Sequence, residues 1–291
     1  MIIVPGPASQ ILGVKVARLL KSEVVNVNFK DFPDGETYVR VEGELNNKDV
    51  LLIQSTYSPQ DKNLIQLFLL IDAVKQMNPA RLRLVIPYFA YARQDKQFKK
   101  GEPLSIKVIE NILEYLGVDE LYTIDLHEPR VLDYLKIKAK DLSAMRLFGE
   151  YFKKRNLSKP LIIAPDDGAI HRAETVAKVL GSEYVSFDKF RDKDTGEITM
   201  DYKKLNVKDR DAVIVDDIIS TGGTMIKAIQ MIKSQGGNNV YVAATHTILI
   251  GEARSKILSA GAADIIGTDT IPSEISVVSV APLIAEQFRG V

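Results

Sequence analysis

Short apolar runs alternate with helix-like segments along the chain, and this alternation limits the folds that it can adopt. The runs with a strand-like pattern lie at residues 50–53, 82–86, 121–124, 161–164, 212–215 and 240–244. Helix-like patterns occupy residues 61–77, 106–116, 143–154, 169–180, 225–234 and 252–259. Such alternation is typical of parallel sheets whose strands are connected by crossover helices. The sequence therefore predicts an α/β fold.

Local signals mark two helix ends and one departure from the alternation. Ser143 is expected to cap the helix that follows it, and Gly236-Gly237 to end the helix before them. Residues 24–29 and 37–41 are both strand-like and are separated by a Pro-Asp-Gly turn sequence. An antiparallel flap is therefore expected within residues 22–46.

Polar strand ends recur in the two halves of the chain. One strand in each half ends in polar residues, at 87–88 and 164–166, and a later strand ends in acids or a histidine, at 125–127 and 216–217. We predict two related α/β domains, residues 1–142 and 143–291. The last helix, residues 281–291, could pack on the first domain. The charged run at 188–199 predicts a surface loop or hairpin.

Composition excludes several classes of protein. Lys plus Arg equals Asp plus Glu, 38 each, so no global field favours nucleic acid or an anionic membrane as a partner. The chain has no cysteine, which excludes disulfides and thiolate zinc sites. The longest apolar stretch, residues 64–74, is interrupted by Gln66 and Asp72 and is too short for a bilayer crossing. No leader pattern is evident, so a cytoplasmic protein is expected.

The segment at residues 215–224 is the strongest functional signal. An apolar run, 212–215, ends in Asp216 and Asp217; small residues follow, and a helical pattern resumes at Met225. A loop at a helix N-terminus presents backbone N–H groups and the positive end of the helix dipole, which together bind phosphate. Ionised carboxylates accept hydrogen bonds from hydroxyl groups. The pattern predicts a sugar-phosphate site, and its plainer alternative is a turn with solvated acids.

Four further segments carry candidate chemistry. They are Phe32 to Glu36 in the flap, Arg93-Gln94-Asp95, Asp125 to His127 at a strand end, and Pro165 to Gly168 before a helix. Each has a plain alternative: a hairpin turn, a solvated loop, a structural histidine and an ordinary loop. However, ligands bind at the carboxyl ends of strands in open α/β sheets. An arginine, a glutamine and an aspartate also suit a purine and a phosphate.

In this order the five segments resemble the ribose-phosphate diphosphokinases, also called phosphoribosyl pyrophosphate synthetases. The loop at 215–224 alone is similar to that of type I phosphoribosyltransferases as well. The resemblance covers nearly the whole chain. It implies two tandem type I phosphoribosyltransferase-like domains, each a mainly parallel sheet flanked by helices, with an antiparallel flap in the first.

The resemblance also implies roles for individual residues. ATP would be bound by Phe32, Asp34, Glu36, Arg93, Gln94 and Asp95. Ribose 5-phosphate would be bound by Asp216, Asp217, Ser220, Thr221, Gly222, Gly223 and Thr224. His127 and Asp166 would hold Mg²⁺ with the triphosphate. The catalytic residues would be Lys189, Arg191 and His127, the first two lying on the charged run at 188–199.

The implied reaction transfers the diphosphoryl group of ATP to the anomeric hydroxyl of ribose 5-phosphate, giving 5-phospho-α-D-ribose 1-diphosphate and AMP. The resemblance further implies a homo-oligomer, at least a dimer, whose flap completes the neighbouring subunit's adenine pocket. Two alternatives remain: a phosphoribosyltransferase, and an inactive regulatory homologue. The sequence departs from the family pattern at Ser220, where an acid is frequent, at Asp167-Gly168-Ala169, which leaves the role of Asp167 open, and at 128–130.

Overall fold

The computed structural model describes residues 1–187, 189–191, 198–200 and 205–290, and the side chains of 189–191 and 198–200 lie outside that description. The chain divides into two compact units. Unit 1 comprises residues 1–143 and 279–291, and unit 2 comprises residues 144–278. Within the described residues, no helix has the length and apolar character that a bilayer crossing requires.

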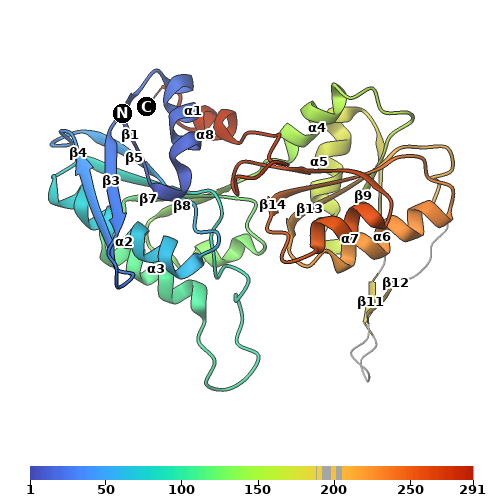
Figure 1. Ribbon diagram of the computed structural model, residues 1–291, viewed down its shortest axis with the longest axis horizontal. Coiled ribbons are helices and arrows are strands. Elements are labelled where there is room, and N and C mark those ends of the chain that lie inside the picture. The colour runs from blue at the N-terminus through green and yellow to red at the C-terminus, as the bar shows by residue number, and fades with distance from the viewer. Residues whose placement is uncertain (188, 192–197, 201–204, 291) are drawn as a thin grey trace. The chain divides into compact units, whose positions relative to one another are not determined.

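Unit 1 is built on a six-stranded parallel sheet (Figure 1). Its spatial order is β2 (Glu23–Val24), β1 (Ile2–Pro5), β5 (Asp49–Ile53), β6 (Arg81–Ile86), β7 (Glu120–Ile124) and β8 (Lys138–Leu142). Apolar residues of α2 (Gln60–Gln76) and α3 (Ser105–Tyr115) share one core cluster with these strands. On the opposite side, α1 (Gln10–Leu20) and α8 (Ala281–Gln287) pack against each other. Short 3-10 turns, η1 (Pro7–Ser9) and η2 (Pro129–Tyr134), complete the unit.

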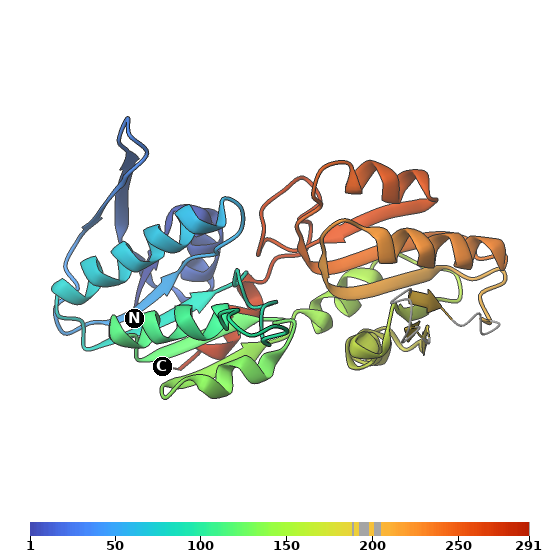
Figure 2. The same cartoon turned by 90° about the horizontal axis from the view of Figure 1, so that it is seen from below.

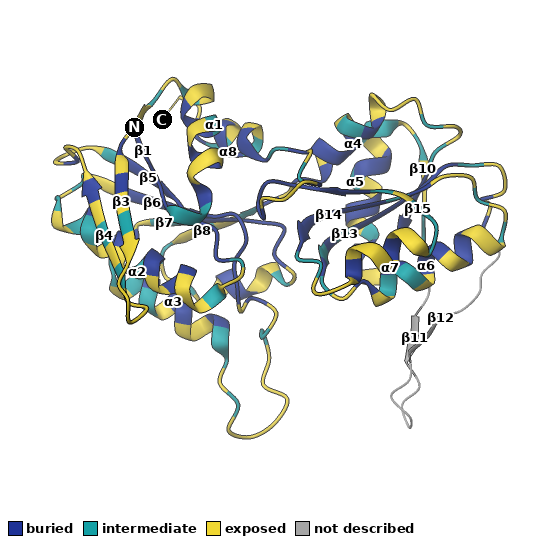
Figure 3. Ribbon diagram, viewed as in Figure 1, coloured by how far each residue is buried: buried dark blue, intermediate teal, exposed yellow. Residues whose placement is uncertain are grey.

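Unit 2 holds a five-stranded parallel sheet whose three central strands are almost entirely buried, while its edge strands are partly exposed (Figure 3). The order is β10 (Glu183–Ser186), β9 (Leu161–Ala164), β13 (Ala212–Ile219), β14 (Val240–Thr247) and β15 (Ala262–Gly267). The helices α6 (Gly223–Ser234) and α7 (Ala253–Ser259) supply the core cluster on one face. The helices α4 (Met145–Lys153) and α5 (Ile170–Leu180) contact each other, and η3 (Asp167–Ala169) precedes α5.

Two antiparallel strand pairs form sheets of their own, separate from the parallel sheets. The strands β3 (Asn26–Asp31) and β4 (Thr37–Glu42) form one of them, which projects from the rest of unit 1 in Figure 2. The other pairs β11 (Lys189–Arg191) with β12 (Ile198–Met200). The expected α/β class, with parallel sheets and an antiparallel flap, is thus confirmed.

Several element boundaries differ from the sequence expectation. The helix expected to begin at Ser143 begins at Met145, and Ala144 occupies its N-cap. The run expected to stop at residue 215 continues to Ile219, because Asp216 and Ile218 still pair with β14. Gly236 does follow the end of α6, with a φ of 84° that suits glycine. The strands β2, β8, β10 and β15 and the helix α1 were not expected from the pattern.

The turn between β13 and α6 depends on Gly222. Its φ is +80°, in the left-handed region, and a Cβ there would lie 2.9 Å from the Cδ1 atom of Ile257 on α7. The next residue, Gly223, begins α6, and a Cβ added to it would meet nothing within 4 Å. The backbone at residue 222 therefore requires glycine, whereas residue 223 has room for a larger residue.

We predict that Gly222→Ala and Gly223→Ala change stability in opposite directions. Gly222→Ala should lower the free energy of unfolding by about 1–2 kcal/mol, the cost of a left-handed backbone for a residue with a Cβ. Gly223→Ala should raise it by about 0.5–1 kcal/mol, because alanine is the better helix former. Urea unfolding of the two variants tests this, and equal effects would contradict the assignment of the turn.

A buried carboxyl on α3 makes the stability of unit 1 depend on pH. Glu110 is 1% exposed, and no donor among the described residues bonds to either carboxyl oxygen. Burial, helped by the charge of Glu114 and opposed by that of Lys107, raises the pKa of Glu110 to about 8. The folded chain therefore keeps a proton that the unfolded chain releases near pH 4.5. Stability is lost as the pH rises from about 4.5 to about 8.

We predict that Glu110→Gln removes this pH dependence. The free energy of unfolding of the variant minus that of the wild type should increase by up to about 1.4 kcal/mol per pH unit between pH 5 and 8. Above pH 8 this difference should stay constant. Urea unfolding across this range measures the difference. The exposed Glu23→Gln serves as control. Parallel profiles for wild type and Glu110→Gln would contradict the prediction.

Candidate functional site

The acid pair lies at the carboxyl end of β13 and is almost enclosed. The side chain of Asp217 is 3% exposed and that of Asp216 is 15% exposed. The buried guanidinium of Arg172, from α5, lies beside both: its Nη2 is 3.5 Å from Asp217 Oδ2, and its Nη1 is 4.0 Å from Asp216 Oδ1. The backbone N–H of Asp217 donates to Asp216 Oδ1 at 2.9 Å. One cation thus faces two carboxyl groups.

The protonation of this pair follows from its surroundings. Burial raises the pKa of Asp216 well above its usual value, and the carboxyls of Asp217 and Asp166 raise it further. The raised pKa favours the protonated form of Asp216 beside the Asp217 carboxyl. A pair in that state can both accept from and donate to hydroxyl groups. It therefore suits a vicinal diol.

The loop that follows, 220–224, is held in place by backbone bonds. The N–H of Ile250 donates to the Ser220 carbonyl at 3.0 Å, and the N–H groups of Ile248 and Leu249 donate to the Ile219 carbonyl. The first turn of α6 contains no acidic residue. The unpaired N–H groups of that turn and the positive end of the helix dipole can therefore bind a phosphate.

A second loop of unit 2 follows β9. Asp166 is partly exposed, and its carbonyl accepts from the N–H of Ala169 at 3.1 Å. Asp167 accepts a hydrogen bond from the Ser186 hydroxyl at 3.2 Å, which gives it a partner on β10. The carbonyl of Gly168 accepts from Arg172 Nη1 at 3.1 Å. The Arg172 side chain therefore links this loop to the acid pair.

In unit 1, buried hydroxyls fix the loops at the carboxyl ends of β1, β5 and β6. Ser9 Oγ accepts from the N–H of Ser55, whose own hydroxyl accepts from the N–H of Tyr88. Thr56 donates to the Tyr88 carbonyl at 2.9 Å and accepts from the N–H of Ala90 at 2.8 Å. These bonds place the segment that carries the predicted ATP residues at 93–95.

The predicted ATP residues of that segment are accessible. Arg93 is exposed, while Gln94 and Asp95 are half-buried. The Gln94 side chain accepts a hydrogen bond from Ser105 at the start of α3. Asp95 lies 3.8 Å from the Lys96 ammonium. The segment offers an exposed guanidinium beside an amide and a carboxylate.

His127 is exposed after the end of β7. Asp141 on β8 orders the strand end before it, because it accepts from the Thr123 hydroxyl at 2.7 Å and from the N–H of Leu126 at 3.1 Å. Beyond it, the Arg130 side chain hydrogen-bonds Glu128 and lowers the pKa of that carboxyl to about 2. This ion pair occupies the stretch where the sequence departs from the family pattern.

Backbone strain gathers at the same strand ends. Tyr91, Asp125 and Leu249 have φ angles of 66°, 44° and 49°, and each lies shortly after the carboxyl end of a strand. Left-handed conformations are disfavoured for bulky residues and recur at binding sites. Among the described residues, the other non-glycine residues with a positive φ are all asparagine, aspartate or lysine.

The flap ends in an exposed aromatic tip. The N–H of Phe32 donates to the Glu36 carbonyl, Gly35 closes the turn with a φ of +95°, and Asp34 Oδ1 accepts from the N–H of Glu36. The Phe32 ring is 40% exposed, and its neighbours are the Tyr38 ring, 6.4 Å away, and the Lys30 ammonium, 5.0 Å away. One face of the ring is therefore available to a ligand.

The four residues predicted to hold the metal or to act in catalysis come from both units of the chain. The side chains of Lys189 and Arg191 lie outside the described residues, although their backbone forms β11. Asp166 belongs to unit 2 and His127 to unit 1. Within the described residues, no group of three or more His, Asp and Glu side chains forms a metal cage.

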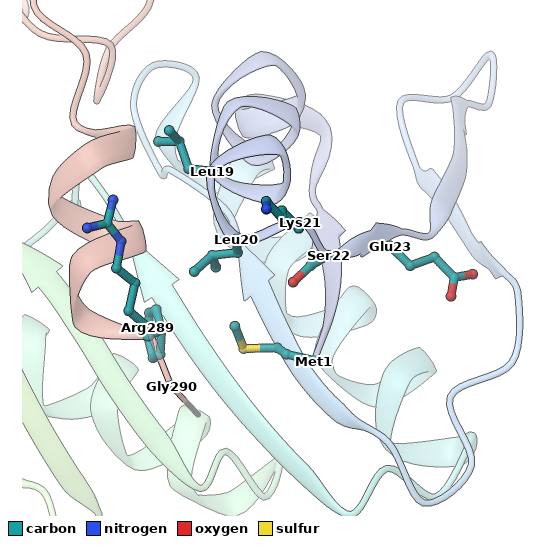
Figure 4. A pocket seen from close by; sticks show the side chains of 9 residues that line it. Met1, Leu19, Leu20, Lys21, Ser22, Glu23, Arg289 and Gly290 are labelled. Atoms are coloured by element: carbon teal, nitrogen blue, oxygen red, sulfur yellow. The ribbon is translucent and has the colours of Figure 1, made fainter.

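Unit 1 has two pockets outside the segments that carry the predicted ATP residues. One, of about 360 Å³, is formed by the end of α1, the start of β2 and the segment after α8 (Figure 4). It lies at the amino-terminal edge of the sheet, opposite the strand ends that carry the candidate residues. The other, of about 380 Å³, lies between β3, η1 and the start of α2.

The sequence analysis missed Arg172. It had a detectable signal: Arg172 falls in the buried stripe of α5 with Ala173, Val176 and Ala177, where an apolar residue is expected. An arginine in such a stripe is almost always paired with an acid. The partner could not be identified, because Asp217 is distant in sequence and comes close only through the parallel sheet.

Known proteins resemble nearly the whole length of this chain. A family model described as the N-terminal domain of ribose phosphate pyrophosphokinase matches residues 1–117, and a phosphoribosyl transferase domain model matches residues 131–272. The ribose-phosphate pyrophosphokinase of Methanosarcina mazei is 43% identical over 99% of this chain and 95% of its own length. That of Sulfurisphaera tokodaii is 37% identical over 99% and 100%.

A solved structure agrees with these relatives. The phosphoribosylpyrophosphate synthetase of Mycobacterium smegmatis superposes with a TM-score of 0.86 at 28% identity, and the match covers 99% of this chain and 97% of that one. Both family domains, full-length relatives and a full-length structural match therefore agree, and the chain belongs to the ribose-phosphate pyrophosphokinase family.

Proposed function

We propose that the chain transfers the diphosphoryl group of ATP to the anomeric hydroxyl of ribose 5-phosphate, and that unit 2 binds the sugar phosphate. The observation that carries this assignment is the buried acid pair in β13, the strand that leads into the N-terminus of α6. Asp216 and Asp217 would bond the two ribose hydroxyls. The 5-phosphate would lie on the backbone N–H groups of residues 220–224.

Unit 1 would bind ATP. Arg93 supplies a guanidinium for phosphate oxygens, while Gln94 and Asp95 supply an amide and a carboxylate. At the strand end of β7, the exposed imidazole of His127 can approach the triphosphate. The reaction then consists of attack by the anomeric oxygen on the β-phosphorus, with AMP as leaving group. The protein contributes mainly position and charge.

The residues present fit Mg²⁺ bound together with substrate. This ion usually keeps several waters and uses one or two carboxylates plus substrate phosphates rather than an all-protein cage. The partly exposed carboxyl of Asp166 meets that description, and the exposed imidazole of His127 would complete the site from the triphosphate side. When bound, the ion supplies neutralising charge to the phosphates. Lys189 and Arg191 would add charge to the transferring group.

Two other functions are separated by one assay. A phosphoribosyltransferase would not use ATP, and the match of residues 1–117 to the pyrophosphokinase N-terminal domain argues against it. An inactive regulatory homologue would lack turnover, and the presence of every predicted residue argues against that. Release of AMP from ATP that requires both ribose 5-phosphate and Mg²⁺ supports the proposal. No AMP release with both present would reject it.

We also propose a homo-oligomer, at least a dimer, with active sites shared between subunits. The support is the flap, which projects from unit 1 (Figure 2). Its turn begins at Phe32, whose ring is exposed. A protruding aromatic at a turn gains by stacking on a base, and such stacking is worth about 1–3 kcal/mol. The flap of one subunit would close the adenine pocket of its neighbour, with Asp34 or Glu36 accepting from the exocyclic amine.

We predict that Asp217→Asn weakens the binding of ribose 5-phosphate without unfolding the protein. The substitution keeps the size of the side chain and removes a charged acceptor, which is worth about 1.5–3 kcal/mol. kcat/KM for ribose 5-phosphate should fall roughly ten- to a hundred-fold. Steady-state kinetics measure it, and wild-type values in the variant would exclude the role.

Asp211→Asn is the matched control for that experiment. Asp211 is also buried next to β13, at its opposite end, where it accepts from the N–H groups of Ser158 and Asn239. This control should lower stability without a selective change in KM for ribose 5-phosphate.

The shared site predicts complementation between two inactive variants. Phe32→Ala/Glu36→Ala removes the flap contacts, and Asp216→Asn/Asp217→Asn removes the sugar contacts. Mixed under conditions that exchange subunits, the two should regain part of the wild-type AMP release, because some sites then combine an intact flap with an intact acid pair. Each variant mixed with itself is the control. Confirmed exchange without activity, or an active monomer by sedimentation, would contradict the shared site.

A further inference from the structure

Arg172 joins two loops of unit 2 that are far apart in sequence. Its Nη1 donates to the Gly168 carbonyl at 3.1 Å, in the loop after β9. Its Nη2 lies 3.5 Å from Asp217 Oδ2, at the end of β13. The side chain is 7% exposed. A single rigid guanidinium therefore sets the separation between the loop that carries Asp166 and the acid pair.

This location is unfavourable for an arginine on grounds of stability alone. Arg172 is the third residue of α5, where the positive end of the helix dipole repels a cation. It occupies the buried stripe of the helix, where an apolar side chain would pack without desolvating a charge. Replacing a buried ion pair by apolar residues is often neutral or stabilising. The position of the cation therefore calls for a reason other than holding the fold together.

A second arginine of unit 2 shows what a purely structural contact of the same kind looks like. Arg210 donates through Nε to the Lys159 carbonyl and through Nη2 to the Pro160 carbonyl, both at 2.9 Å. Its Nη1 pairs with Glu183 at 2.6 Å. These partners lie at the amino-terminal end of the sheet, away from the acid pair. Arg210 thus ties chain segments together without touching a candidate ligand site.

We infer that Arg172 is a positioning residue for the sugar site: its forked contact with Gly168 and Asp217 fixes Asp217 as the acceptor for a ribose hydroxyl and holds the loop after β9 in register with it. This rests on the proposed binding of ribose 5-phosphate by unit 2. The role requires both Nη atoms of the guanidinium, because a lysine ammonium is a point charge that cannot make both contacts in the same geometry. Arg172 itself does not touch the reacting atoms.

Three variants test the inference by the pattern of kinetic constants. Arg172→Ala should raise KM for ribose 5-phosphate roughly ten- to a hundred-fold, as expected for an acceptor left misplaced, while KM for ATP changes by less than about threefold. Arg172→Lys should keep the charge and recover only part of the loss. Millimolar guanidinium chloride should restore activity to Arg172→Ala, because the ion can enter the vacated position. Arg210→Ala should lower the unfolding midpoint and leave both KM values unchanged.

The outcomes separate the inference from the function on which it rests. If the wild type releases no AMP with ribose 5-phosphate present, the proposed function fails first. If the wild type is active and folded Arg172→Ala retains its KM for ribose 5-phosphate, the inference is wrong. It is also wrong if Arg210→Ala shows the same selective rise, or if Arg172→Lys matches the wild type. If Arg172→Ala does not fold, the test rests on Arg172→Lys. A raised KM for ribose 5-phosphate in that variant supports the inference, and a wild-type KM contradicts it.

Discussion

The structure of unit 2 depends on how two carboxyl groups are kept at the end of a buried strand. Isolated charges in such a place are expensive, so the pair must be neutralised or share a proton. Arg172 provides one charge, and burial together with the neighbouring acids raises the pKa of Asp216 well above its usual value. These three side chains form a polar surface within an otherwise apolar part of the sheet. The α6 N-terminus, Gly222 and the loop after β9 are all placed with respect to it.

The geometry of parallel sheets explains why both units present their candidate residues on loops after strands. Crossover helices occupy the faces, so polar side chains gather at the carboxyl ends. In unit 1 the hydroxyls of Ser9, Ser55 and Thr56 replace water as partners for backbone groups there. In unit 2 the N–H groups of residues 248–250 donate to the carbonyls of Ile219 and Ser220, and the left-handed Gly222 turns the chain into α6. Rigidity of this kind lowers the entropy lost when a ligand binds.

Much of the fold and of the candidate site could be predicted because the relevant signals are local. The alternation of runs, the turn at Gly35 and the loop at 220–224 each depend on a few adjacent residues. The edge strands were missed for a physical reason: β8 carries Lys138 and Lys140 and lies half in solvent, so its apolar signal is weak. The length of β13 was underestimated because Asp216 and Asp217 end the apolar run but not the hydrogen-bonded ladder. Arg172 could not be paired with Asp217 before the sheet order was known.

The central claim is that the chain moves two phosphoryl groups at once from ATP to a sugar phosphate held by the acid pair. A ³¹P NMR time course of the purified protein with ATP, ribose 5-phosphate and Mg²⁺ tests it most directly. The account predicts that the β- and γ-phosphorus signals of ATP disappear together, while AMP and a sugar 1-diphosphate appear in equal amounts. Accumulation of ADP with a singly phosphorylated product, or ATP left unchanged, would contradict it.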